Sequence, residues 1–104
     1  MTERLEIPFD VMDGLAATCI PGFAPGFMDF RREQVDPGRV IYHLLQDNLG
    51  ELGTLEIVDA GDGVTLEWKV IPVPGQEMTE RRQAHLANGQ AAFWSRMEQE
   101  QRWA

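Results

Sequence analysis

Cysteine and histidine are scarce in this sequence of 104 residues, which contains Cys19, His43 and His85 as its only residues of these types. A single cysteine cannot form a disulfide within the chain, so we interpret Cys19 as a small apolar core residue in a reducing compartment. No paired-cysteine spacing and no His-Glu-x-x-His motif is present to bind zinc. We therefore expect neither a metal nor a cofactor.

Catalytic and phosphate-binding motifs are also missing. The sequence has no Gly-rich loop ending in Lys-Ser or Lys-Thr, and no Gly-x-Ser-x-Gly. Residues 59–63 form an acidic stretch, but glycines stand where a calcium loop needs oxygen ligands, so we interpret it as a turn. A Cys19 thiolate activated by His43 stays open as an alternative, provided that the fold brings the two together. The sequence indicates no catalytic base or nucleophile, so we do not favour an enzyme.

Long apolar runs and basic residues are few. No stretch approaches the roughly 18 apolar residues of a membrane-spanning helix. Lysine and arginine number 9 against 17 aspartates and glutamates, which gives a formal net charge of -8. This charge repels phosphate backbones and anionic lipid surfaces, so neither nucleic acid nor a membrane is expected as a partner. The charged N-terminal residues lack the apolar core of a secretory signal, and we expect a cytoplasmic protein.

The composition that is present is typical of one globular domain. Hydrophobic residues make up 43% of the chain and charged residues 25%, which are ordinary values for a folded protein. A chain of this length buries roughly 65% of the surface that it exposes when unfolded, enough for one modest core. We expect residues 1–104 to form a single soluble domain.

The N-terminal part of the chain predicts a strand and a short helix. Apolar and polar residues alternate over residues 3–9, which is the period of a half-buried strand. Asp10 stands where an N-cap belongs, and a helix is expected from there through Cys19. Pro21 and Gly22 should end this helix, because neither residue continues one easily.

Residues 20–30 combine two Pro-Gly breaks with three phenylalanines, Phe23, Phe27 and Phe30. We predict irregular or briefly helical structure for this segment. It is too apolar to lie wholly in water, so its rings either plug one end of the core or form a lid over a ligand.

Three strands are predicted in the middle of the chain. Residues 39–46 are apolar on both faces, so this strand is either central in a sheet or covered on its second face by another element or subunit. Residues 53–58 and 64–70 alternate on either side of the turn and predict a hairpin. In this hairpin we expect Lys69 to lie across from Glu56 on the solvated face.

The last segment predicts one long amphipathic helix, from about residue 79 to about residue 102. Leu86, Phe93 and Met97 fall on one line of this helix, which we interpret as its core face. The opposite arc is polar and contains Arg81, Asn88, Ser95 and Gln99.

Together these elements predict an α+β fold, with an antiparallel sheet of about four strands, a short N-terminal helix and one long C-terminal helix packed on one face. Their order, with the stretches GTLEIV at residues 53–58 and DGVTLEW at residues 62–68, resembles the helix-grip fold of the START/Bet v 1-like (SRPBCC) superfamily. The resemblance implies a cavity for apolar ligands between the sheet and the last helix. The grip of that superfamily needs several more strands, so the resemblance is to a shortened form.

Two classes of function follow. The first is a domain that binds an apolar small molecule, and its ligand-binding residues are Phe23 and Phe27 over the mouth, Tyr42 and Trp68 on the sheet, and Phe93 and Trp94 on the helix. The second is a structural or protein-interaction module, in which the same rings fill the core and the chain acts as a homodimer. A second copy would complete the sheet or cover its back, because about four strands leave edges and a face unprotected.

Overall fold

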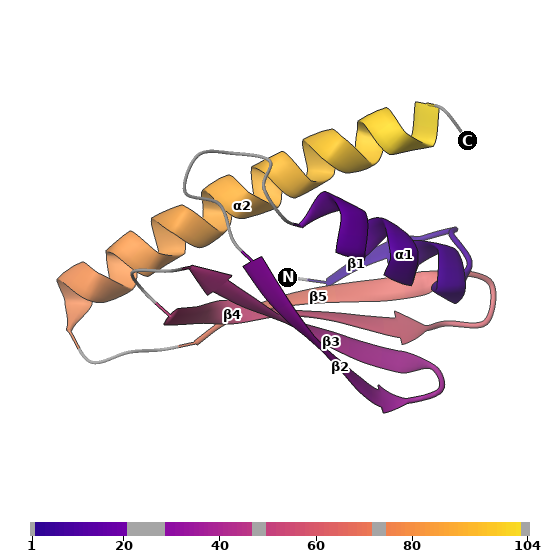
Figure 1. The fold of residues 1–104 in the computed structure, drawn as a ribbon, viewed down its shortest axis with the longest axis horizontal. Helices are drawn as coiled ribbons and strands as arrows, with labels where there is room; N and C mark the ends of the chain where they lie inside the picture. Colours follow the sequence, from indigo (N-terminus) through magenta and orange to yellow (C-terminus); the bar gives the residue numbers. More distant parts are fainter. Residues whose placement is uncertain (1, 21–28, 47–49, 72–74, 103–104) are drawn as a thin grey trace.

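The computed structural model describes residues 2–20, 29–46, 50–71 and 75–102, which form one sheet and two helices (Figure 1). The elements follow one another as β1 (Thr2–Leu5), α1 (Phe9–Cys19), β2 (Asp29–Asp36), β3 (Arg39–Gln46), β4 (Gly50–Asp59), β5 (Val64–Val70) and α2 (Gln76–Arg102). Both helices lie on the same side of the sheet, and α2 crosses it diagonally. The predicted α+β class, with its antiparallel sheet and long final helix, is confirmed.

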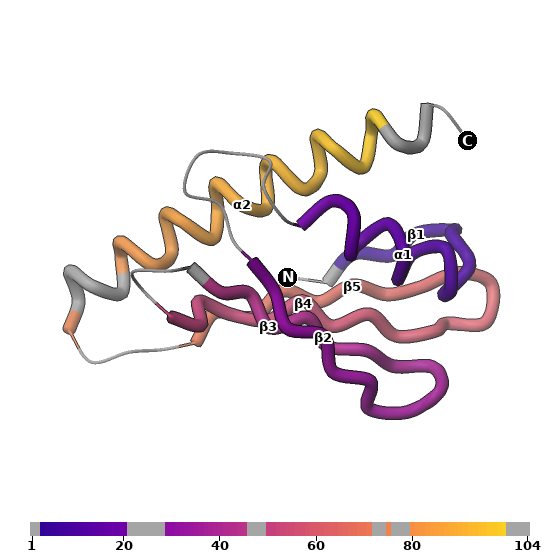
Figure 2. The backbone as a smooth tube through the Cα atoms, in the orientation of Figure 1, coloured from indigo at the N-terminus to yellow at the C-terminus, as the bar shows by residue number. Residues whose placement is uncertain are grey.

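The sheet has the strand order β1-β5-β4-β3-β2, and all neighbouring strands are antiparallel. Strands β2 to β5 form a meander of successive neighbours. Strand β1 lies at the other edge, beside β5, so the chain passes from one edge of the sheet to the other between β1 and β2 (Figure 2). The helix α1 lies within this crossing and is thereby placed over the sheet.

Strand β2 corrects the sequence prediction, which assigned Asp29 and Phe30 to an irregular segment and placed no strand between that segment and the strand at residues 39–46. These residues begin an eight-residue edge strand that pairs with β3, with Phe30 opposite Leu44. The strand was missed because seven of its eight residues are exposed, so it shows no apolar alternation. The sheet consequently has five strands among the described residues, one more than the expected count of about four.

The core lies between the helices and one face of the sheet. Alternate residues of β3, β4 and β5 point toward the helices, because successive side chains of a strand face opposite ways. The buried residues of these three strands on the helix side include Val40, Tyr42, Leu44, Leu55, Ile57, Val64, Leu66 and Trp68. The helix α1 adds Met12, Ala16 and Cys19 to this core.

The predicted core face of α2 is confirmed. Leu86, Phe93 and Met97 are 2%, 0% and 2% exposed, and the opposite arc, which contains Arg81, Asn88, Ser95 and Gln99, is exposed. The helix approaches β4 closely at Gly53. A Cβ atom there would lie 3.3 Å from Cδ2 of Leu86 and would overlap the carbonyl oxygen of Lys69.

Two local predictions were wrong. The helix α1 begins at Phe9 with Pro8 as its N-cap residue and no side-chain cap, so Asp10 lies in the first turn instead of at the cap. In the β4–β5 pair, Glu56 lies opposite Glu67, and Lys69 lies opposite Thr54. The register is shifted by two residues from the expected one, which keeps every side chain on its predicted face.

Neither helix within the described residues has a stretch long and apolar enough to cross a lipid bilayer.

Candidate functional site

Three of the predicted ligand-binding residues form one continuous group of rings between the sheet and α2. The ring centroids of Trp68 and Phe93 are 5.2 Å apart at an interplanar angle of 79°. Those of Phe93 and Trp94 are 5.3 Å apart at 81°. Both are edge-to-face arrangements, which aromatic pairs favour. The group runs from Trp68, which is buried on β5, to Trp94, which is only partly buried on α2.

Trp68 carries a polar group that its surroundings do not satisfy. Its side chain belongs to the core, with 6% of the residue exposed, and its Nε1 atom has no hydrogen-bond partner among the residues that the structure describes. An indole N–H is a donor only, and buried indoles nearly always find an acceptor. Leaving such a donor unsatisfied costs about 1 to 3 kcal/mol. This unsatisfied N–H therefore distinguishes the ring group from an ordinary apolar core.

Tyr42, a fourth predicted ligand-binding residue, does not join this group. Tyr42 is fully buried but packs on Phe30 of β2, with ring centroids 5.1 Å apart at an angle of 63°. Phe23 and Phe27 lie outside the described residues, so their predicted place over the mouth of a ligand site stays a prediction.

Tyr42 belongs to a polar cluster that ties the sheet to α1. Its hydroxyl lies 2.9 Å from the carbonyl oxygen of Asp13 and also donates to the Asp13 carboxylate. The guanidinium of Arg32, on β2, binds both carboxylate oxygens of Asp13, at 3.1 Å and 2.6 Å. One carboxylate of α1 is thus held by side chains from two strands.

The cluster moves the pKa values of its members in opposite directions. Burial raises the pKa of Tyr42 above its ordinary value, and the hydrogen bond to the ionised Asp13 raises it further. Burial alone would raise the pKa of Asp13, but the hydrogen bonds from Arg32 and Tyr42 outweigh it and lower the pKa. The stable state is therefore a neutral phenol beside an ionised carboxylate, which suits a structural tie.

His43 lies on the face of the sheet that carries no helix. Its Nδ1 atom is 2.6 Å from Oε1 of Glu51, and its Nε2 atom is 2.8 Å from Oε1 of Glu33. Cys19 is buried in α1 on the opposite side of the sheet. The two residues therefore cannot act as a thiolate and its base, and the Cys–His alternative left open by the sequence is excluded.

Glu51 connects this outer face with α2. Its side chain contacts His43, while its backbone oxygen accepts a hydrogen bond from Nη2 of Arg82. Arg82 is only 7% exposed. Arg82 is not among the residues predicted from the sequence, although its position four residues before Leu86 places it on the core stripe of α2. That spacing is the signal that would have found it.

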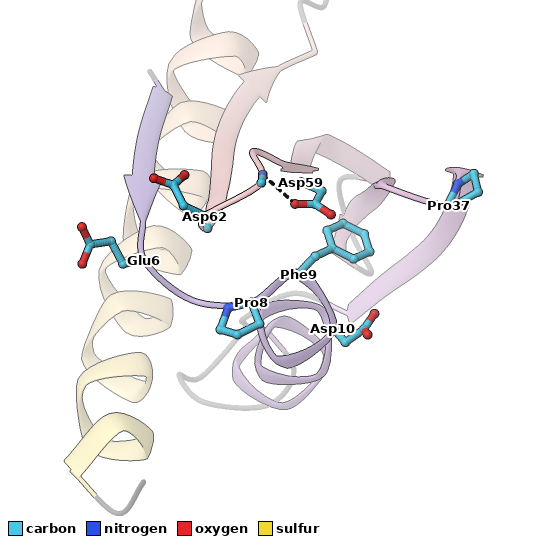
Figure 3. Close-up of a pocket in the computed structure, with 9 residues that line it drawn as sticks. Glu6, Pro8, Phe9, Asp10, Pro37, Asp59 and Asp62 are labelled. Atoms are coloured by element: carbon cyan, nitrogen blue, oxygen red, sulfur yellow. Dashed lines mark hydrogen bonds between the residues drawn. The ribbon is translucent and has the colours of Figure 1, made fainter.

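A hollow of about 520 Å³ lies at the far end of the sheet, where the β4–β5 turn meets the start of α1 (Figure 3). It is lined by Glu6, Pro8, Phe9, Asp10, Pro37, Asp59, Gly61, Asp62 and Gly63. Asp59 accepts a hydrogen bond from the Gly61 amide at 2.9 Å, and Asp62 pairs with Arg4. The carboxylate of Glu6 points outward, away from the ring of Phe9. Two of the acidic side chains are therefore already engaged, Asp59 within the loop and Asp62 with Arg4 of β1.

The described part of the chain contains no group of three or more histidine, cysteine, aspartate or glutamate side chains arranged to hold a metal ion. Comparison of the chain with protein-family models, with curated proteins and with solved structures finds no match.

Proposed function

We propose that the protein is a small-molecule-binding domain that holds an apolar ligand between the sheet and α2. The observation that carries this proposal is the Trp68 indole N–H, which is buried beside Phe93 and has no acceptor within the described part of the chain. A core that served packing alone would place an apolar residue at this position, because an unsatisfied donor weakens the fold. A ligand beside the indole could accept a hydrogen bond from this N–H and so satisfy it.

The arrangement of the elements supports the same function. The long helix α2 lies across the sheet, and the order of elements is that expected for a shortened helix-grip fold. The superfamily relationship itself remains part of the proposal. Trp94 would form the outer rim of the site, because it continues the ring group from Phe93 and is only partly buried.

Binding of a neutral apolar fluorophore tests the proposal. We expect N-phenyl-1-naphthylamine to bind with a stoichiometry of one and to quench tryptophan emission. Trp68→Leu should abolish binding while the circular dichroism spectrum and urea midpoint show a folded protein. Thr54→Ala, on the helix-free side of β4, is the matched control and should bind like the wild type. A folded wild type that binds no apolar probe would refute the function.

A homodimer is the second candidate, and it is favoured by the composition of the helix-free face. Ile41 and Leu45 of β3 and Val58 of β4 lie there, and each is partly exposed. Because both helices cover the other face, we propose that a second copy of the chain packs on this one. Sedimentation velocity tests it directly. Ile41→Lys should lower the sedimentation coefficient to that of a monomer, and a wild type that is already monomeric at millimolar concentration would refute it.

A further inference from the structure

We infer that the ligand is a neutral molecule with an apolar body and one hydrogen-bond acceptor, and that this acceptor receives the Nε1–H of Trp68. The inference rests on the proposed function and adds the chemical class of the ligand. It predicts a preference for compounds such as ketones, esters or ethers over hydrocarbons and over carboxylate anions.

The acceptor follows from the indole itself. Its N–H can donate and cannot accept, so a hydroxyl or amide hydrogen on the ligand would gain nothing from it. A pure hydrocarbon would leave the N–H as unsatisfied as it is without ligand. An oxygen with a lone pair directed at Nε1 removes the desolvation penalty and adds a hydrogen bond.

The neutral charge follows from the surroundings of Trp68. The ring of Phe93 packs on it, and the neighbouring residues on the same face of β5 are Leu66, which is buried, and Val70, which is 40% exposed. Burying an unpaired carboxylate among such side chains is strongly unfavourable. The two arginines on the inner part of α2, Arg82 and Arg96, both take part in interactions of their own. The chain also carries a net charge of -8, which disfavours an approaching anion.

Three ligands of matched size test the inference on the intact protein. Butylbenzene has no acceptor, butyrophenone has a carbonyl in place of its benzylic methylene, and 4-phenylbutyrate has a carboxylate at the end of a similar chain. We expect butyrophenone to bind about fivefold more tightly than butylbenzene, since one neutral hydrogen bond contributes about that factor. Phenylbutyrate should bind more weakly than either. Trp68→Phe should bind both neutral ligands with equal affinity.

The indole NMR signal of Trp68 gives a readout that does not depend on a variant. In wild-type protein, its Nε1–H resonance should shift downfield with butyrophenone and not with butylbenzene, which separates a hydrogen bond from mere occupancy. This measurement decides the matter even if Trp68→Phe fails to fold.

The failures are distinguishable. If none of the three ligands binds, the proposed function is wrong and the inference falls with it. If the two neutral ligands bind equally to the wild type, the domain binds apolar molecules but Trp68 Nε1–H does not select them. If phenylbutyrate binds most tightly, the ligand is an anion and the neutral class is wrong.

Discussion

The hydroxyl of Tyr42 in the middle of β3 is hydrogen-bonded to Asp13 of α1, through both the backbone oxygen and the carboxylate. The phenol reaches from the sheet to the helix, and the carboxylate that it meets there is also bound by Arg32. A fully buried tyrosine is therefore accommodated because its only polar atom is satisfied. This contact fixes the position of α1 over the sheet.

Tyr42 is the only tyrosine in the sequence, so its ionisation can be followed without assignment. Its pKa is raised by burial and by the hydrogen bond to Asp13. A free tyrosine phenol, whose pKa is 10.0, is half ionised at pH 10.0, but at this pH the folded protein should show no tyrosinate absorbance at 295 nm. The contribution of the buried phenol to the free energy of unfolding should be fully present below this pH. It should fall as the pH rises above it, because only the unfolded chain readily loses the phenol proton.

A stopped-flow pH jump checks this expectation. The absorbance should appear only with the unfolding phase that circular dichroism reports. Immediate appearance of tyrosinate near pH 10 in a protein that is still folded would contradict the buried contact with Asp13.

The ionisation of Asp13 should make the free energy of unfolding depend on pH in the acidic range. Its pKa lies below 3.8 in the folded protein, because the Arg32 and Tyr42 hydrogen bonds outweigh its burial. Its contribution is therefore present above the unfolded value and lost as the pH falls through the lower folded value. Asp13→Asn should be less stable than the wild type by about 1 to 2 kcal/mol at neutral pH. Urea unfolding should show that this difference shrinks on acidification below about pH 4.

Glu6→Gln, at an exposed carboxylate before α1, is the matched control for this series. It should follow the wild type across the same pH range. An Asp13→Asn curve that runs parallel to the wild type down to pH 2 would show that the ion pair with Arg32 contributes nothing.

Two glycine substitutions should act in opposite directions. Gly53→Ala should destabilise the protein by about 2 to 3 kcal/mol, because its Cβ would meet the Lys69 carbonyl and Leu86. Gly14→Ala should stabilise it by about 0.5 to 1 kcal/mol, because Gly14 is inside α1 with nothing within 4 Å of an added Cβ. Thermal unfolding of the two variants checks both signs. A neutral Gly53→Ala would contradict the close approach of the Lys69 carbonyl to this position.

Phe93→Ala should be the most damaging truncation on α2. The side chain is fully buried between Trp68 and Trp94, so its removal should cost about 3 to 5 kcal/mol. Ser95→Ala, on the exposed arc of the same helix, should change stability by less than about 0.5 kcal/mol. Guanidinium unfolding midpoints compare the pair. Equal midpoints would show that α2 is not packed on the sheet.

The sequence predicted which side chains share a face, because a strand alternates with a fixed period and an error of two residues leaves that alternation intact. It did not predict the register, which is why Lys69 was placed opposite Glu56. In the structure Glu56 is bound by Arg39 of the neighbouring strand, at 2.6 Å. That partner comes from β3, and no pattern within the hairpin could identify it.

The candidate site was predictable in part. The helical spacing of Phe93 and the strand position of Trp68 placed both between sheet and helix. The unsatisfied indole N–H was not predictable, because it depends on which hydrogen-bond acceptors lie near Trp68 in the folded chain. The edge strand β2 was missed because Arg32, which faces the core side, is polar and reaches Asp13. From the sequence alone, an arginine at this position is interpreted as a side chain exposed to solvent.

The pairing of β1 with β5 also has a consequence for the order in which the strands can pair during folding. During synthesis β1 emerges early, but its partner begins only at Val64. The meander from β2 to β5 can form from near neighbours, whereas docking of β1 has to close a loop that includes nearly all of it. We therefore expect β1 to dock after the meander has formed, and until it docks one edge of β5 is free to pair with another chain.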